Sequence, residues 1–234
     1  MTAATDFADS LLAVARPAPV ESNPVVAGLV EGRLSRDAVR RYAIALAAIA
    51  ESFPRRISAV LAICDDQDVR RSLMNNLLEE EGVTRFVPAE GMQIDPERRH
   101  GVMGRRLARA AGATDAEIDA VPSQPARWFT DALRAGDWLG AFSFFSIGFE
   151  ANVPATFRAI VEPLTAHYGF TSHELEFLYE HFTADERHGI EAAHLIARAA
   201  TTEALRGRAR EGARRGGAAW WAFHRAIAAE PVHA

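Results

Sequence analysis

The sequence predicts an all-α fold, a single bundle of about seven to nine helices that spans residues 1–234. Apolar residues recur at helical spacing along most of the chain, whereas runs of β-branched residues are short. No internal repeat and no low-complexity linker divides the 234 residues. Long helical segments joined by short connections are typical of a bundle around one core.

The expected helices follow from this periodicity and from residues that begin helices. They cover residues 5–15, 23–31, 35–63, 67–82, 96–111, 122–135, 137–166, 171–200 and 203–228. Asp95-Pro96 has the pattern of an N-cap residue followed by proline in the first turn. Thr171 and Glu174 have the spacing of a capping box, which predicts a helix start there.

Two prolines and one irregular stretch interrupt the pattern. Pro54 and Pro154 fall inside long apolar segments, and we expect each to kink its helix because proline lacks the N–H donor. Residues 83–93 form the longest irregular stretch. We expect a loop between two helices there, and this loop is a candidate lid over a site.

Composition limits the classes of partner and chemistry. The net charge of −5 gives no reason to expect nucleic acid or an anionic membrane. Every basic side chain is arginine, which excludes Schiff-base chemistry and a lysine acid or base. The single cysteine, Cys64, excludes an intramolecular disulfide and a thiolate-rich metal site. No signal-like or membrane-length segment occurs, so we expect a cytoplasmic protein.

The most informative pattern is His-x-x-x-Asp-x-x-His, formed by His181, Asp185 and His188 within the predicted helix 171–200. A helix turns ~100° per residue, so these three side chains lie in one narrow stripe. Apolar residues occupy the same stripe, within about 60° of His181. They are Phe177, Leu178, Ala192, Leu195, Ile196 and Ala199. The three polar residues should therefore face the core, where a metal ion can satisfy all of them.

Three more titratable residues lie in apolar stripes of other predicted helices. They are Glu80, His100 and Glu150. Six groups from four helices, three carboxylates and three imidazoles, suit one or two iron or manganese ions in a bundle core. Each residue alone has a simpler role: His100 as a hydrogen-bonded core histidine, Glu80 as a cap or ion-pair partner, and Glu150 as the partner of an arginine such as Arg158. The combination favours metal.

A rival ligand set imitates the ferritin-like pattern with two Glu-x-x-His pairs, Glu97 with His100 and Glu191 with His194. Glu191 and His194 are turned about 80–140° away from His181 on the helical wheel, which predicts that they are solvated. Glu97 lies one turn before His100 and remains a possible extra ligand. Its alternative role is that of an acid in a first helical turn.

At these residues the chain resembles a known superfamily. The stretch from Phe53 to Gly82 looks like the N-terminal half of haem-oxygenase-like proteins, which include the thiaminase-II (TenA-like) enzymes, the pyrroloquinoline quinone synthases and the di-iron oxidases. Residues 95–112 are similar to the segment that carries the first histidine ligand of the di-iron branch. Residues 149–154 resemble that branch's Glu-x-x-x-Pro segment, and residues 181–188 resemble its closing motif. The similarity covers roughly residues 23–225.

The resemblance implies a haem-oxygenase-like helical domain that binds iron, Fe(II)/Fe(III), as two ions and uses O2 as co-substrate. The implied ligands are Glu80, His100, Glu150, His181, Asp185 and His188, with Glu81 or Glu97 as open alternatives. The implied reactions are N-oxygenation, desaturation or oxidative C–C cleavage of a small amine or carboxylic acid, often an amino acid. A homodimer and an external reductant are also implied.

We expect the organic substrate to lie between the metal and a group of aromatic residues. This predicted pocket consists of Phe142, Phe145, Phe149, Phe157 and Arg158. The arginine would anchor a carboxylate.

Departures from the family narrow the chemistry. One branch uses a lysine after the Glu-x-x-x-Pro segment and a tyrosine just before its glutamate in self-consuming chemistry. This chain has no lysine, and Phe149 stands before the glutamate, so we do not expect that reaction. A thiaminase-II role would need a cysteine in the pocket, whereas Cys64 should be a small core residue.

Two alternatives to a di-iron oxidase or oxygenase stay open. They are a metal-free enzyme of this fold acting on a heterocycle and a non-catalytic helical binding protein.

Overall fold

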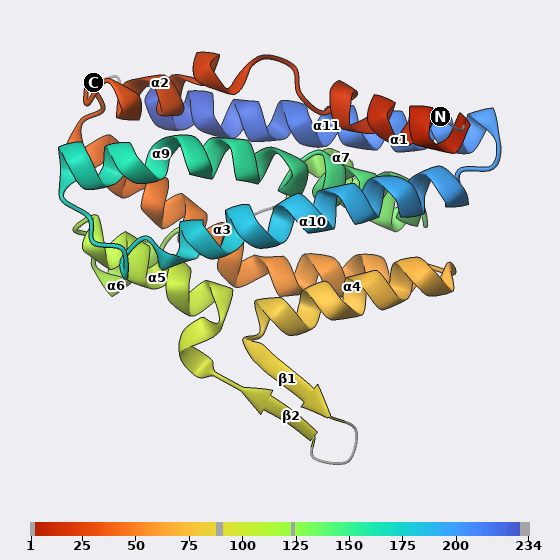
Figure 1. The fold of residues 1–234 in the computed structure, drawn as a ribbon, viewed down its shortest axis with the longest axis horizontal. Helices are drawn as coiled ribbons and strands as arrows, with labels where there is room; N and C mark the ends of the chain where they lie inside the picture. Colours follow the sequence, from red (N-terminus) through yellow and green to blue (C-terminus); the bar gives the residue numbers. More distant parts are fainter. Residues whose placement is uncertain (1–2, 88–90, 123–124, 230–234) are drawn as a thin grey trace.

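Helices make up most of the described part of the chain, and one β-hairpin projects from them (Figure 1). The computed structural model describes residues 3–87, 91–122 and 125–229. The α-helices are α1 (Ala3–Val14), α2 (Pro24–Val30), α3 (Arg36–Ile63), α4 (Gln67–Glu80), α5 (His100–Ala110), α6 (Asp115–Asp119), α7 (Arg127–Arg134), α8 (Trp138–Phe142), α9 (Val153–Tyr168), α10 (Glu176–Ala199) and α11 (Glu203–Ala228). The predicted all-α class is confirmed.

Short helical pieces complete these elements. Three are 3-10 helices, η1 (Val20–Ser22), η2 (Pro96–Arg98) and η4 (Glu150–Asn152), and one is a π-helix, η3 (Ser143–Ile147). The strands β1 (Val83–Val87) and β2 (Gly91–Ile94) pair antiparallel. Within the described residues, no helix combines the length and apolar character needed to cross a bilayer.

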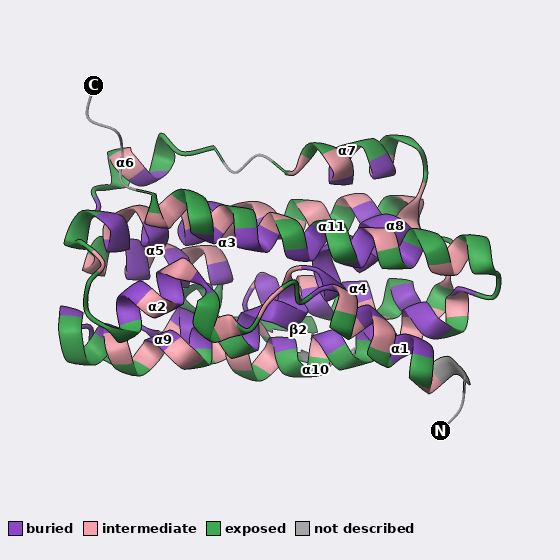
Figure 2. Ribbon diagram, turned by 90° about the horizontal axis from the view of Figure 1, so that it is seen from above, coloured by how far each residue is buried: buried purple, intermediate pink, exposed green. Residues whose placement is uncertain are grey.

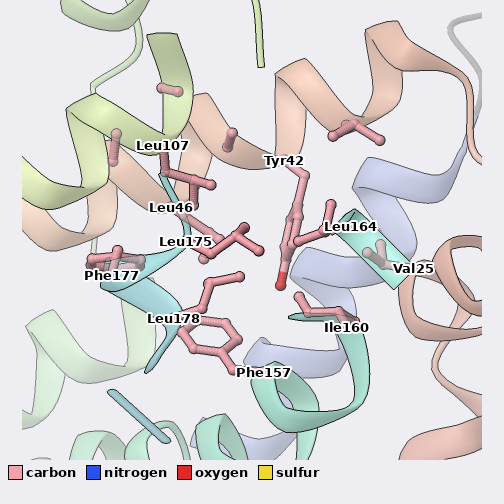
Figure 3. Packing of buried hydrophobic residues seen from close by; sticks show 14 of the residues in the cluster. Val25, Tyr42, Leu46, Leu107, Phe157, Ile160, Leu164, Leu175, Phe177 and Leu178 are labelled. Atoms are coloured by element: carbon pink, nitrogen blue, oxygen red, sulfur yellow. The ribbon is translucent and has the colours of Figure 1, made fainter. Parts of the chain in front are cut away.

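The long helices bury one face each and pack lengthwise. Helix α3 packs along α5, α9 along α10, and α11 along α8 and η3. Figure 2 shows buried residues on the inward faces of these helices and exposed residues on the outer faces. In one core cluster, Leu46 of α3 meets Phe157 of α9 and Leu178 of α10 (Figure 3).

A second core cluster contains Phe53, Phe142 and Phe145. Phe149 packs against both clusters. The neighbouring Glu150 therefore lies where the two clusters meet.

The predicted helix 137–166 is wrong as one continuous element. The chain passes through α8, η3 and η4 before α9 begins at Val153. Pro154 lies in the first turn of α9 rather than at a kink, because a proline without an N–H is tolerated at a helix start. Asn152 donates its amide hydrogens to the carbonyl oxygens of Gly148 (2.9 Å) and Ala15 (3.1 Å), which helps to satisfy the interrupted backbone. By contrast, α3 continues through Pro54.

The predicted loop 83–93 is also wrong over its described residues, which form the β1–β2 hairpin. Gly82 (φ 74°) and Gly91 (φ 84°) adopt left-handed backbone conformations that favour glycine. The amide of Asp95 donates to the carbonyl of Gly82 (2.9 Å) and closes the base of the hairpin. Residues 88–90 of the predicted loop lie outside the described residues.

Several predicted helix ends need correction. The Asp95-Pro96 start caps only η2, and α5 begins at His100. The capping exchange between Thr171 and Glu174 forms, but it closes a turn, and α10 begins at Glu176. In the predicted helix 122–135 the described helix is α7, and residues 123–124 lie outside the described residues. The unpredicted α6 starts at a capping box. Residues 1–2 and 230–234 of the predicted domain 1–234 are not described either.

Candidate metal centre

Four elements bring the six predicted ligands into the interior. Glu80 is the last residue of α4, His100 is the first residue of α5, and Glu150 is the first residue of η4. The other three, His181, Asp185 and His188, lie on one face of α10. The structure thus brings together side chains from distant parts of the sequence, and it does so in two groups of three.

The first group contains Glu80, His100 and His181, each offering one donor atom within 4.8 Å of the others. Nδ1 of His100 lies 3.0 Å from Oε2 of Glu80. The rings of His100 and His181 lie against each other, with centroids 4.3 Å apart. Nδ1 of His181 is 2.7 Å from the carbonyl oxygen of Phe177, so this nitrogen donates to the backbone and Nε2 is available to a ligand.

The second group contains Glu150, Asp185 and His188, whose donor atoms also lie within 4.8 Å of one another. Nδ1 of His188 is 3.5 Å from Oδ1 of Asp185. Nδ2 of Asn76 donates to Oε1 of Glu150 at 2.8 Å, and this bond is buried. Asn76 lies one turn before Glu80 on α4, so the same helix face serves both groups.

Burial dominates the electrostatics of five of these residues. It raises the pKa of Glu80 to about 7 and that of Asp185 to about 8, and it raises the pKa of Glu150. Burial lowers the pKa of His100 to about 4 and that of His181 to about 3. The cause is the loss of hydration, which disfavours every charged form. A cation between these groups would offset that penalty for the carboxylates and bind the neutral imidazoles.

His188 behaves differently because it lies between two carboxylates. Burial alone would lower its pKa, but the neighbouring carboxylates of Asp185 and Glu79 outweigh this effect and raise the pKa to about 10. Its side chain is 12% exposed, so it forms the outer edge of the second group.

Unsatisfied polar atoms test whether these residues fit a metal. Four of the six residues each hold a buried atom without a hydrogen-bond partner among the described residues: Oε2 of Glu80, Nδ1 of His100, Oε2 of Glu150 and Nδ1 of His188. Buried polar atoms in folded proteins are normally satisfied, so four in one place require a partner. Carboxylate oxygens and imidazole nitrogens are the donors that iron and manganese bind, and the residues fit such an ion.

A small apolar cavity of about 40 Å³ adjoins both groups. Its polar lining is Glu80, Glu150, His181 and Asp185. Its apolar lining is Leu46, Ile49, Ala50, Phe53, Phe149, Val153, Phe157, Phe177 and Trp220. The lining holds no arginine. A molecule that enters this cavity meets aromatic walls on one side and the candidate ligands on the other.

Of the aromatic residues predicted to form the substrate pocket, Phe149 and Phe157 line this cavity, whereas Phe142 and Phe145 do not. Phe142 and Phe145 belong to the second core cluster, where Phe145 packs behind Phe53 with ring centroids 5.8 Å apart. Their predicted orientation assumed a continuous helix, and the π-helix and the break before α9 change the phase between the two segments.

The prediction for Arg158 is wrong. Its side chain is 56% exposed, forms an ion pair with Glu186 (3.1 Å) and stacks over the ring of Phe182. Arg158 follows the buried Phe157 directly, and a helix turns ~100° per residue, so it points away from the cavity. Arg158 does not line the cavity, and among the described interactions it pairs with Glu186 and not with Glu150.

Both alternative glutamate ligands lie outside the two groups. Glu97 is 75% exposed and faces Arg106, and Glu81 pairs with Arg99 at the base of the hairpin. Glu191 and His194 are exposed, as predicted.

Cys64 is buried at the C-terminal end of α3, among the residues of the second core cluster. Burial raises its pKa to about 11, and it does not line the cavity described above. It therefore lacks the exposure and the acidity of a nucleophilic cysteine.

The sequence did not reveal three residues of the centre. Asn76 could have been found, since it shares the helix face of Glu80, but an asparagine alone is a weak signal. Trp220 lines the cavity from α11. Glu79 projects beside the centre and reaches His188, with Oε2 3.1 Å from Nε2. Its partners lie more than a hundred positions away in the sequence, so no local pattern indicates its role.

Comparison with known proteins identifies the family of this chain. A family model described as iron-containing redox enzyme matches residues 40–221. The chain is 28% identical to the 4-aminobenzoate synthase of Chlamydia trachomatis over 176 residues, which cover 71% of this chain and 68% of that protein. It is 26% identical to the 4-aminobenzoate synthase of Chlamydia muridarum over 201 residues, which cover 82% and 78%.

Solved structures share the fold at low sequence identity. A TenA homologue from Pseudomonas syringae pv. tomato matches with a TM-score of 0.71 at 14% identity, over 96% of this chain and 90% of that one. A domain with a haem-oxygenase-like fold from Shewanella denitrificans matches with a TM-score of 0.64 at 12% identity, over 96% and 88%. Because the family model covers most of the chain, the protein belongs to the iron-containing redox enzyme family and is an iron oxidoreductase with a haem-oxygenase-like helical fold.

Proposed function

We propose that this protein is an O2-dependent di-iron oxidase or oxygenase. One observation carries the proposal: two groups of three donors meet at a single apolar cavity, and four of their buried atoms have no hydrogen-bond partner among the described residues. Two ions account for this arrangement better than one, because each group by itself offers three donor atoms. The proposed ligands are Glu80, His100, Glu150, His181, Asp185 and His188.

The protein's own residues hold the centre in place. The carbonyl of Phe177 accepts the Nδ1 hydrogen of His181 and so fixes the ring with Nε2 toward the first group. Asn76 fixes one oxygen of Glu150 and leaves the other, Oε2, for a metal. The aromatic walls exclude water from the cavity. Iron bound there supplies redox chemistry and a binding place for O2.

The proposed substrate is a small amine or carboxylic acid. Because the cavity is about 40 Å³ and its lining contains carboxylates but no arginine, the part of the substrate that enters it is small and carries no negative charge. The chlamydial relatives are named for a compound that is both an aromatic amine and a carboxylic acid, which falls within this class. The chain has no lysine, and Phe149 precedes Glu150, so we propose an external substrate rather than a self-consuming reaction.

Anaerobic loading with Fe(II), followed by an iron assay and by visible absorbance after exposure to O2, tests the proposal. We expect about two irons per chain and a transient visible band, since each group of three donors suits one ion. H188A should lose iron. H194A is the matched control, because it makes the same change on the same helix at an exposed position outside both groups.

Less than about one iron per chain without a transient band would contradict the proposal. A reaction that survives chelation and D185A would favour the metal-free alternative.

A further inference from the structure

The two ring nitrogens of His188 face different surroundings. Nδ1 points to the interior of the second group, 3.5 Å from Oδ1 of Asp185, and it is buried without a hydrogen-bond partner among the described residues. Nε2 points outward and lies 3.1 Å from Oε2 of Glu79 and 3.3 Å from Nη2 of Arg187, and of these two neighbours only the carboxylate can accept a hydrogen. Glu79 belongs to neither group of candidate ligands.

This orientation decides which nitrogen can bind a metal. An ion shared with Asp185 and Glu150 must lie on the interior side of the ring, where Nδ1 is. A neutral imidazole that gives Nδ1 to a metal carries its hydrogen on Nε2, and this N–H needs an acceptor. Oε2 of Glu79 lies where that acceptor is required.

We propose that Glu79 is a positioning residue for the metal centre: its carboxylate accepts the Nε2 hydrogen of His188 and so presents Nδ1 to the ion of the second group. The inference rests on the proposed metal function and adds a residue that binds no metal itself. A carboxylate behind a ligating histidine fixes the tautomer and the ring orientation and makes the imidazole a stronger donor.

Glu79 is itself held in place by Arg187. Nη2 of Arg187 lies 2.9 Å from Oε1 and 3.2 Å from Oε2 of Glu79. Glu79 directly precedes the candidate ligand Glu80 on α4, and Arg187 directly precedes His188 on α10. The ion pair therefore joins the two helices one residue away from a candidate ligand on each side.

The solvent exposure of the Glu79–Arg187 ion pair allows a positioning role of Glu79 to be distinguished from a purely structural one. The side chain of Arg187 is 64% exposed and that of Glu79 is 35% exposed. Exposed ion pairs contribute little to folding stability. If Glu79 matters for the metal, its removal should therefore weaken metal binding while leaving the metal-free protein folded and about equally stable.

A first experiment compares E79A and E79Q with the wild type by anaerobic competition between the protein and a chelator for Fe(II), together with thermal unfolding of the metal-free proteins. We expect E79A to weaken binding of one ion about 10- to 100-fold, as is typical for loss of such a carboxylate. E79Q should be less impaired, because the amide oxygen can still accept the N–H. The unfolding temperatures of the metal-free proteins should stay close to that of the wild type.

The matched control is E186Q. Like Glu79, Glu186 is the sequence neighbour of a candidate ligand, because it directly follows Asp185. It also forms an ion pair with an exposed arginine, Arg158. It has no contact with a histidine of either group among the described interactions. E186Q should bind Fe(II) as the wild type does.

A second experiment reads the tautomer directly. Histidine side chains labelled with ¹⁵N are observed by NMR in the protein loaded with Zn(II), a diamagnetic ion with similar donors. We expect the hydrogen of His188 on Nε2 and the metal on Nδ1 in the wild type, and a weakened Nε2 hydrogen bond in E79A.

Each result decides between defined outcomes. Unchanged Fe(II) affinity in E79A, or a hydrogen on Nδ1 of His188, would overturn the inference while the metal function stands. Complete loss of one ion in both E79A and E79Q would overturn it too, because Glu79 would then be a ligand. A wild-type protein that binds no metal would overturn the proposed function itself.

Discussion

Oε2 of Glu80 lies 3.0 Å from Nδ1 of His100, yet neither atom makes a hydrogen bond with any described residue. Both side chains are buried, at 5% relative exposure. Two polar atoms held so close without bonding are destabilising in the metal-free protein, because neither recovers the hydration it has lost. An ion bound as we propose would satisfy both atoms.

Replacement of this glutamate by an apolar residue should separate folding from metal binding. We expect E80M to unfold at the same or a higher temperature than the wild type without metal, because an apolar side chain of similar length removes an unsatisfied carboxyl group. Added Fe(II) or Zn(II) raises the unfolding temperature of the wild type by mass action, and this increase should shrink in E80M. A lower unfolding temperature without metal would contradict the prediction. E162M, which changes an exposed glutamate of α9, is the control.

Enlargement of the cavity should change what it admits. Phe157 lies between Phe177, His181 and Trp220, with ring centroids 6.1 to 6.2 Å apart. F157A should lower the free energy of unfolding by about 3–5 kcal/mol and still bind the same amount of iron, since Phe157 offers no donor atom. Benzene should then raise the unfolding temperature of F157A but not that of the wild type. Equal shifts in both proteins would show that the cavity is not limited by this ring.

Two glycines of α11 should respond in opposite directions to the same substitution. A Cβ at Gly216 would overlap the carbonyl oxygen of Phe144 and lie 2.7 Å from Cα of Gly148, whereas a Cβ at Gly207 meets no atom within 4 Å. We expect G216A to lower the free energy of unfolding by about 1–3 kcal/mol or more, because the helix must move away from η3. G207A should raise it by about 0.5–1 kcal/mol. Chemical denaturation of both variants measures the difference, and equal effects would contradict it.

The buried His224 should make the folded protein less stable at acid pH. Its Nδ1 lies 2.8 Å from the carbonyl of Trp220 and its Nε2 lies 3.2 Å from the hydroxyl of Tyr42, and burial lowers its pKa from 6.5 to about 4. His224 binds a proton below pH 6.5 in the unfolded chain but only below about pH 4 in the folded protein. His224 therefore leaves the free energy of unfolding unchanged above pH 6.5 and lowers it as the pH falls toward 4, by roughly 3 kcal/mol at most.

The corresponding variant is H224Q. Between pH 6.5 and 4 its free energy of unfolding should fall less steeply than that of the wild type, measured by denaturant titration at each pH. H194Q, which changes an exposed histidine, should follow the wild type. Parallel curves for H224Q and the wild type would exclude His224 as the source of the slope.

The sequence was sufficient for the parts of the centre that depend on one regular helix. His181, Asp185 and His188 lie on a continuous stretch of α10, so their spacing and their apolar neighbours define one face. Glu80 could be recognised in the same way near the end of α4. Glu150 was found although its helix is interrupted, because its whole surroundings are apolar and remain buried in the fold.

The rest depends on contacts between distant segments. The break around residues 143–152 occurs where Gly148 and Gly216 bring two helices close together, and no local propensity indicates that approach. This break misdirected the predictions for Phe142 and Phe145. The hairpin was missed because each strand is only four or five residues long. The alternation of apolar and polar residues in such short strands cannot be distinguished from the helical spacing on both sides.

The hairpin begins three residues after the candidate ligand Glu80, and η2 connects its second strand to the candidate ligand His100. Its two ends are joined at the base by the backbone hydrogen bond between Asp95 and Gly82 and by the ion pair of Arg99 with Glu81. Glu80 and His100 therefore stay in register whatever length of chain lies between the closed ends. This makes the hairpin the natural point for insertion or exchange of a segment beside the proposed iron centre, since such a graft would alter the approach to the centre without displacing the candidate ligands.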